Sequence, residues 1–164
     1  MKYILSHFTH ETDVNPLAKG FANHVTPLQL AAAGTSNGHV KIVRMIVARI
    51  SPPQDIEEFL KWDYVTFERA AQGGNLEIFK IIAESFGNII NPSNHYNENQ
   101  TPLHVASTNA NFEVCKYILQ NVYYKHSKNS QKETPLDLAK SCGNTKIVQL
   151  IEFYSRIRNR HTQR

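Results

Sequence analysis

The sequence predicts an all-α protein built as a solenoid of stacked helix-turn-helix units with finger loops between them. Three observations lead to this prediction. A Thr-Pro-Leu triplet begins at Thr26, Thr101 and Thr134, and an alanine follows three residues after each leucine. A fourth, degenerate copy begins at Val65, so that successive copies are 39, 36 and 33 residues apart. An apolar stretch with helical spacing follows every copy.

Each triplet is interpreted as the start of a short first helix. A threonine hydroxyl can accept a hydrogen bond from a free amide at a helix N-terminus, and a proline at the first helical position has no amide to leave unpaired. Gly38, Gly74 and Gly143 are expected where the first helix ends and the chain reverses, because glycine tolerates positive φ. Ala110 holds this place in the third unit and fits it less well.

The apolar stretch after each turn is interpreted as a second helix. Apolar residues at spacings of three and four give each helix a stripe wide enough to pack on both neighbours. The four stripes are Val40, Ile42, Val43, Ile46 and Val47; Leu76, Ile78, Phe79, Ile81 and Ile82; Val114, Cys115, Ile118 and Leu119; and Ile147, Val148, Leu150 and Ile151.

The segment between the first and second units is longer than the other connections. Ser51-Pro52-Pro53 is typical of a helix start, and about two apolar-spaced turns follow it and end at Lys61–Tyr64. Residues 88–100 and 121–133 are polar and rich in Asn, Ser and Lys, so we expect exposed loops there.

A period near 33 residues, made of a turn and two short helices, resembles the ankyrin repeat. His104 stands where ankyrin repeats commonly carry a histidine that braces neighbouring turns, and Gln29, Glu68 and Asp137 fill the same position in the other units. Lys2-Tyr3-Ile4-Leu5 duplicates residues 116–119, which suggests that the chain begins inside a repeat. The resemblance implies a single domain with a half repeat and loop over 1–25, four repeats over 26–64, 65–100, 101–133 and 134–154, and a basic tail over 155–164.

Composition and length fit a soluble intracellular protein of the cytoplasm or nucleus. The chain has 164 residues, of which 41% are hydrophobic. No apolar run approaches the eighteen residues of a membrane span, and the start lacks the pattern of a secretion signal. Of the two cysteines, Cys115 falls in a second helix and Cys142 just before a turn, which fits a reducing compartment.

The positive charge is concentrated at the C-terminus. The 18 Lys and Arg exceed the 14 Asp and Glu by four, and this excess equals the arginines of the tail, Arg156, Arg158, Arg160 and Arg164. Arginines at the end of the last helix suit its dipole and would give the solenoid a solvated cap. The alternatives are contact with nucleic acid, which is less favoured, with an acidic partner or with anionic lipid, and a role as a localisation signal.

The sequence gives little support for catalysis. It contains no phosphate-binding loop, no dinucleotide-binding glycine fingerprint and no pair of Cys-x-x-Cys motifs. His7 and His10, followed by Glu11, have a spacing that could bind metal, but no convincing third and fourth ligands lie nearby. We therefore expect no enzyme activity, no cofactor and no metal.

The resemblance implies a monomeric protein-binding scaffold. Ankyrin partners usually contact the finger tips and the first helices across a concave face, and the outward first-helix positions here include Ala33 and Ser141. Trp62 and Tyr64 would place aromatic rings on this face, although Trp62 could equally pack its own long loop. An architectural segment of a longer repeat protein, and an adaptor or inhibitor acting through its basic tail, remain alternatives. The predicted partner-binding residues are Asn23, Val25, Trp62, Tyr64, Gln72, Tyr96, Glu98, Gln100, Thr108, Asn109, Gln131 and Glu133.

Overall fold

The computed structural model describes residues 25–49, 56–85, 99–121 and 127–161, with the backbone alone for helical residues 56–64 and 158–161. Every regular element in these ranges is an α-helix, which confirms the predicted fold class. In chain order the helices are α2 (Pro27–Ala32), α3 (Asn37–Val47), α4 (Ile56–Gly73), α5 (Leu76–Ser85), α6 (Pro102–Thr108), α7 (Phe112–Asn121), α8 (Pro135–Ser141) and α9 (Thr145–His161).

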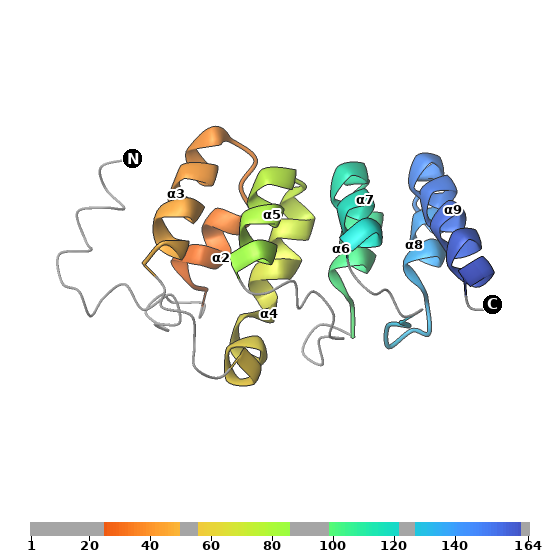
Figure 1. The fold of residues 1–164 in the computed structure, drawn as a ribbon, viewed down its shortest axis with the longest axis horizontal. Helices are drawn as coiled ribbons and strands as arrows, with labels where there is room; N and C mark the ends of the chain where they lie inside the picture. The colour runs from red at the N-terminus through yellow and green to blue at the C-terminus, as the bar shows by residue number, and fades with distance from the viewer. Residues whose placement is uncertain (1–24, 50–55, 86–98, 122–126, 162–164) are drawn as a thin grey trace.

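The described helices form pairs that stand side by side in a row (Figure 1). The two helices of each pair contact each other. The first helices α2, α4, α6 and α8 contact one another in that order, and the second helices α3, α5, α7 and α9 do the same. Each unit therefore packs on the next one, which is the arrangement of a solenoid.

Threonine caps begin three of the four first helices, as the sequence predicts. The Thr26 hydroxyl accepts a hydrogen bond from the Gln29 amide at 3.2 Å, and the Gln29 side chain accepts one from the Thr26 amide at 3.1 Å. Proline opens these helices in each case. The same closed pair of bonds joins Thr101 with His104 and Thr134 with Asp137. Two amides that a helix start would leave unpaired are satisfied in each unit.

The turn residues of the last three units have left-handed backbone conformation. The φ angle is 72° at both Gly74 and Gly143, and 59° at Ala110. The turns after α6 and α8 contain the same type of hydrogen bond. In each of them, the amide of the residue that follows the left-handed residue donates to the carbonyl oxygen five residues earlier. Glycine adopts this conformation without steric cost, whereas Ala110 adopts it with strain.

The expectation that Gly38 forms the turn of the first unit is wrong. Gly38 is the second residue of α3, and its φ is not positive. Ser36 instead lies at the N-cap of α3 in extended backbone conformation. The chain reversal before α3 therefore falls within the inserted residues 34–36, and no left-handed residue is needed there.

The second unit also departs from the prediction. The sequence predicted a two-turn helix ending at Lys61–Tyr64 and a separate helix after it, but α4 is one helix of 18 residues. Thr66 lies inside α4 and is buried, so it does not cap a helix. Phe67 follows Thr66 where the other units have leucine after proline, and no proline in α4 prevents the helix from extending backwards. The first part of α4 extends past the other first helices, on the side of the 127–133 loop (Figure 1).

Asparagine side chains tie each unit to the one before it. Asn111 donates through Nδ2 to the carbonyl oxygens of Ala71 at 2.7 Å and Gln72 at 2.9 Å, at the end of α4. Asn144 donates to the carbonyl oxygen of Ser107 at 2.7 Å in the same way. Asn75 donates to the carbonyl oxygen of Thr35 at 3.2 Å. These bonds satisfy carbonyl groups near the ends of first helices and set the register between units.

The predicted stripes of the second helices are buried or half-buried throughout. The Phe79 ring lies edge-on to Phe67 within its own unit, at 6.3 Å between centroids, and edge-on to Tyr117 of the next unit at 5.9 Å. The core is therefore continuous from one unit to the next. Among the described residues, no helix combines the length and the apolar character needed to cross a bilayer.

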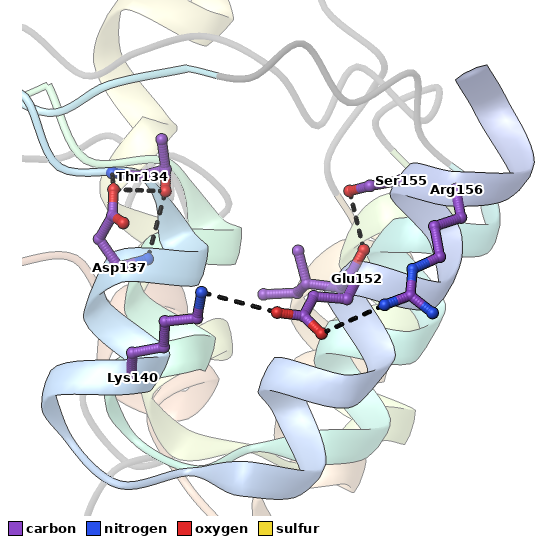
Figure 2. A network of polar contacts seen from close by, with 7 residues as sticks. Thr134, Asp137, Lys140, Glu152, Ser155 and Arg156 are labelled. Carbon is purple, nitrogen blue, oxygen red and sulfur yellow. Dashed lines mark hydrogen bonds and ion pairs between the residues drawn. The ribbon is translucent and has the colours of Figure 1, made fainter.

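The last unit carries ion pairs where inner units carry buried apolar side chains. Glu152 in α9 occupies the position of Ala83 in α5 and Leu119 in α7, both buried. Its carboxylate lies 3.6 Å from the Lys140 amine and 4.0 Å from the Arg156 guanidinium (Figure 2). α9 itself continues to His161, so residues 155–161 of the predicted tail are helical.

Candidate partner-binding surface

A row of exposed polar side chains lies at the ends of the first helices. Gln72, Thr108 and Ser141 are exposed and occupy equivalent places in successive units, and the exposed Asn109 directly follows Thr108. Their backbones are held in register by the asparagine bonds described above, because Asn111 bonds to the Gln72 carbonyl directly. The stacking of the units thus brings together residues that are 36 or 33 positions apart in the sequence.

The side chains at the end of α6 turn back on their own helix. The Thr108 hydroxyl donates to the His104 carbonyl oxygen at 3.1 Å, and Asn109 Nδ2 donates to the Val105 carbonyl oxygen at 2.8 Å. Since both amino acids remain exposed, they present defined orientations to a partner. A partner that binds these side chains would therefore restrict few additional torsions.

A second row lies at the opposite ends of the first helices, just before each threonine cap. Val25, Gln100 and Glu133 are half-buried there. Because α6 and α8 contain seven residues each, this row is about 10 Å from the first.

The loop before α8 holds Glu133 in place. The Glu133 amide donates to Asn129 Oδ1 at 2.8 Å, and Asn129 Nδ2 donates to the Glu133 carboxylate at 3.1 Å. Gln131 is exposed at the tip of this loop, next to Lys132 with a φ of 64°. The finger therefore has a defined shape that its own side chains maintain.

Leu30 is a surface residue that the sequence prediction omitted. It lies in α2 between the two rows and is 55% exposed, whereas Val105 at the equivalent place in α6 is 7% exposed. Arg69 and Leu138 at the same position of the other units are half-buried. The helical register could have identified Leu30, since its neighbours Gln29 and Ala31 are the residues that face the cap and the core.

Several predicted binding residues are not placed by the structure. Asn23, Tyr96, Glu98 and the tail residue Arg164 lie outside the described residues, as do His7, His10 and Glu11. The backbone of Trp62 and Tyr64 is part of α4, so these residues stand in a helix and not on an ordinary finger, and their side chains are outside the described set. The same holds for the side chains of Arg158 and Arg160 in α9.

Three titratable groups with shifted pKa values belong to the helix caps or to the core. Burial lowers the pKa of His104, whose ring closes the cap of α6. Hydrogen bonds from Thr134 lower the pKa of the Asp137 carboxyl, and burial raises the pKa of the Cys115 thiol to about 12. Within the described ranges, no group of three or more His, Cys, Asp or Glu residues has an arrangement that could hold a metal ion.

Comparison with known proteins agrees with this geometry. The protein-family model that describes three copies of the ankyrin repeat matches residues 67–159. The family model of a single ankyrin repeat matches residues 23–55. A stretch of 63 residues is 35% identical to the potassium channel GORK of Arabidopsis thaliana. That stretch covers 38% of this chain and only 8% of the length of the channel.

Proposed function

The chain belongs to the ankyrin repeat family, and from this membership we propose that it holds a partner protein on its concave face and performs no catalysis. The proposed surface consists of the row Gln72, Thr108, Asn109 and Ser141, the fingers before the first helices, and Leu30 between them. Ankyrin repeats generally serve as protein-protein interaction modules, and this general role is the starting point of the proposal.

One observation supports this surface above the others. Exposed polar side chains recur at the same place in successive units, on backbone that the asparagine bonds hold in register. Such a surface exists before the partner arrives, so that little conformational entropy is lost on binding. Leu30, in the first unit, would add an exposed apolar side chain to this otherwise polar surface.

The proposal is tested by placing bulk and charge on the row. The double variant Gln72→Arg with Thr108→Arg should no longer capture a specific partner protein that the wild type captures. The captured proteins are identified by mass spectrometry. The matched control is Ser85→Arg with Gln120→Arg, which adds the same charge at exposed positions of the second helices α5 and α7. Capture that survives in the control but not in the row variant supports the proposal, and equal capture by both contradicts it. Trp62→Ala with Tyr64→Ala tests the aromatic contribution in the same assay.

A second candidate is an architectural segment of a longer repeat protein. The comparison with the channel favours it, because the similar stretch there is a small part of a much longer chain. In that role the solenoid would hold neighbouring segments of its own protein, and no separate partner would depend on the concave row. The two candidates differ in the capture experiment, since only a scaffold is expected to lose a partner when the row is changed.

A third alternative, an adaptor that binds its partner through the arginines of α9, is distinguished by salt. Its binding would weaken steeply as the salt concentration rises.

A further inference from the structure

The outward side of α9 carries an exposed apolar pair. Phe153 is 57% exposed and Ile157 is 36% exposed, and the two are one helical turn apart. The residue ten positions after the turn is Glu84 in the second unit and Gln120 in the third, and both are exposed. Phe153 occupies this place in the last unit. An aromatic ring has therefore replaced a polar side chain on the row that faces solvent.

The fold does not account for this pair. α9 packs on the solenoid through Ile147 and Ile151, which are 2% and 1% exposed. The Phe153 ring has an edge-on contact with Tyr154, at 5.4 Å between centroids, and still leaves more than half of its surface to solvent. Adjacent exposed apolar side chains with polar groups around them are one feature of surfaces that another molecule covers.

One exposed positive charge lies beside the pair among the described side chains. Arg156, three residues after Phe153, has 79% of its side chain exposed, and the acid group at 4.0 Å from it is Glu152, itself 38% exposed (Figure 2). An exposed ion pair at that distance is weak and can be displaced by another carboxylate. Position 160 follows Phe153 by seven residues and so lies on the same side of α9. The arginines at 156, 158, 160 and 164 together match the whole excess of positive charge in the chain.

We propose that the end of α9, defined by Phe153, Arg156 and Ile157 and here called the α9 patch, binds an acidic peptide segment of a partner protein. Apolar side chains of the peptide would cover Phe153 and Ile157, and one of its carboxylates would face Arg156. The α9 patch belongs to a second helix, whereas the surface proposed above belongs to the first helices and the fingers. The two proposals therefore stand or fall separately.

The number of exposed apolar residues favours a peptide over a bilayer. Helices that bind membrane surfaces present an apolar face over several turns. In α9 the residues Ile147 and Ile151 are buried in the solenoid, so that the described part of the helix offers only Phe153 and Ile157 as large exposed apolar side chains. A peptide interface can depend on so few side chains, because a small number of residues carries most of the binding energy of an interface.

The α9 patch is tested by peptide display on the intact protein. A phage library of random 12-residue peptides is selected on the wild-type chain. The affinity of each enriched peptide is then measured by fluorescence anisotropy, for the wild type and for the double variant Phe153→Gln with Ile157→Gln. Phe153→Gln introduces the residue that α7 carries at this place. Because both side chains are exposed, the helical signal and the unfolding midpoint should not change. Gln149→Ala, at an exposed position of α9 one turn before Phe153, is the control.

We expect enriched peptides that contain Asp or Glu beside apolar residues, and that bind the double variant at least about tenfold more weakly but the control equally well. Arg156→Gln should lower the affinity of the protein for the same peptides and reduce the salt dependence of their binding. The proposal is overturned if no enriched peptide distinguishes the double variant, or if those that do lack acidic residues. It is also overturned if the double variant loses binding to vesicles of anionic lipid, or to a thymidine oligonucleotide, while peptide binding is unchanged.

Discussion

The ring of His104 joins two units, since its Nε2 atom lies 3.1 Å from the carbonyl oxygen of Glu133, 29 residues further along the chain. Its Nδ1 atom lies 3.0 Å from the Thr101 amide nitrogen, which can only donate. Nδ1 must therefore carry a lone pair, and the proton belongs on Nε2, from which it is donated to Glu133. The neutral ring satisfies both contacts, whereas a second proton on Nδ1 would oppose the Thr101 amide.

Stability should consequently fall as the pH drops below about 6.5. Burial lowers the pKa of His104 from its ordinary value of 6.5, so the unfolded chain takes up a proton before the folded chain does. The free energy of unfolding then rises with pH between the folded and unfolded pKa values of His104. Above about pH 6.5 this gain in stability is fully present. The contribution of His104 to this slope is at most about 1.4 kcal/mol per pH unit. Urea unfolding at several pH values between 5 and 8 measures it.

His104→Gln is the matched control for this titration. Gln29 already closes the same cap in the first unit without a titrating group, so the variant should keep the cap of α6 and lose the bond to Glu133. We expect it to be about 1 kcal/mol less stable than the wild type at pH 8. The difference should shrink below pH 6.5, and a difference that stays constant from pH 8 to 5 contradicts the assignment. The lowered pKa of the Asp137 carboxyl changes the free energy of unfolding at pH values below its ordinary pKa of 3.8, which lie outside the range of this titration.

Removing one asparagine tie should destabilise the solenoid. Asn111→Ala removes two hydrogen bonds to carbonyls of the preceding unit and leaves the Ala71 carbonyl without that partner. We expect a loss of about 1 to 2 kcal/mol in the free energy of unfolding, from urea titration with an unchanged slope. Asn121→Ala is the comparison, because among the described residues its Nδ2 donates to the Tyr117 carbonyl of its own helix and to no other unit. That change should cost less than about 0.5 kcal/mol, and equal losses for the two variants would show that the tie between units contributes nothing.

The repeating parts of the fold could be predicted from the sequence, because they depend on local rules. Thr-Pro fixes a helix start through one hydroxyl and one missing amide, and the caps at Thr26, Thr101 and Thr134 are where the triplets place them. The prediction was wrong where the pattern is interrupted. The insertion before Gly38 shifts the turn to earlier residues, and the absence of proline at position 66, where the other units have it, lets α4 continue backwards.

The contacts between units could not be predicted in this way. Nothing in the local sequence shows that Asn111 reaches back to α4, since that bond depends on how two units stack. The proposed surface could be derived from the sequence only in part, for the same reason. The positions of Gln72 and Thr108 follow from the repeat, but the exposure of Leu30 depends on what covers α2.

Ala110→Gly should stabilise the protein. The left-handed φ of 59° at Ala110 costs an amino acid with a Cβ atom about 1 kcal/mol relative to glycine, and Ala110 is exposed, so little packing is lost. Gly143→Ala is the reverse change at the same turn of the last unit, with a φ of 72° and no atom within 4 Å of an added Cβ. The two variants should therefore shift the free energy of unfolding by similar amounts in opposite directions. A loss of stability in Ala110→Gly would mean that the methyl group contributes packing not apparent from its exposure.

The two cysteines should differ sharply in reactivity with a thiol reagent such as 5,5′-dithiobis(2-nitrobenzoate) at pH 8. Cys142 is exposed and should react quickly in the folded protein. Cys115 is fully buried in α7, and burial raises its pKa from 9.0 to about 12, which leaves roughly a thousandfold less of the reactive thiolate. Its slow reaction should accelerate in urea in parallel with unfolding. Cys142→Ser should abolish the fast phase and leave the slow one, and a fast phase that persists in this variant would place Cys115 within reach of solvent.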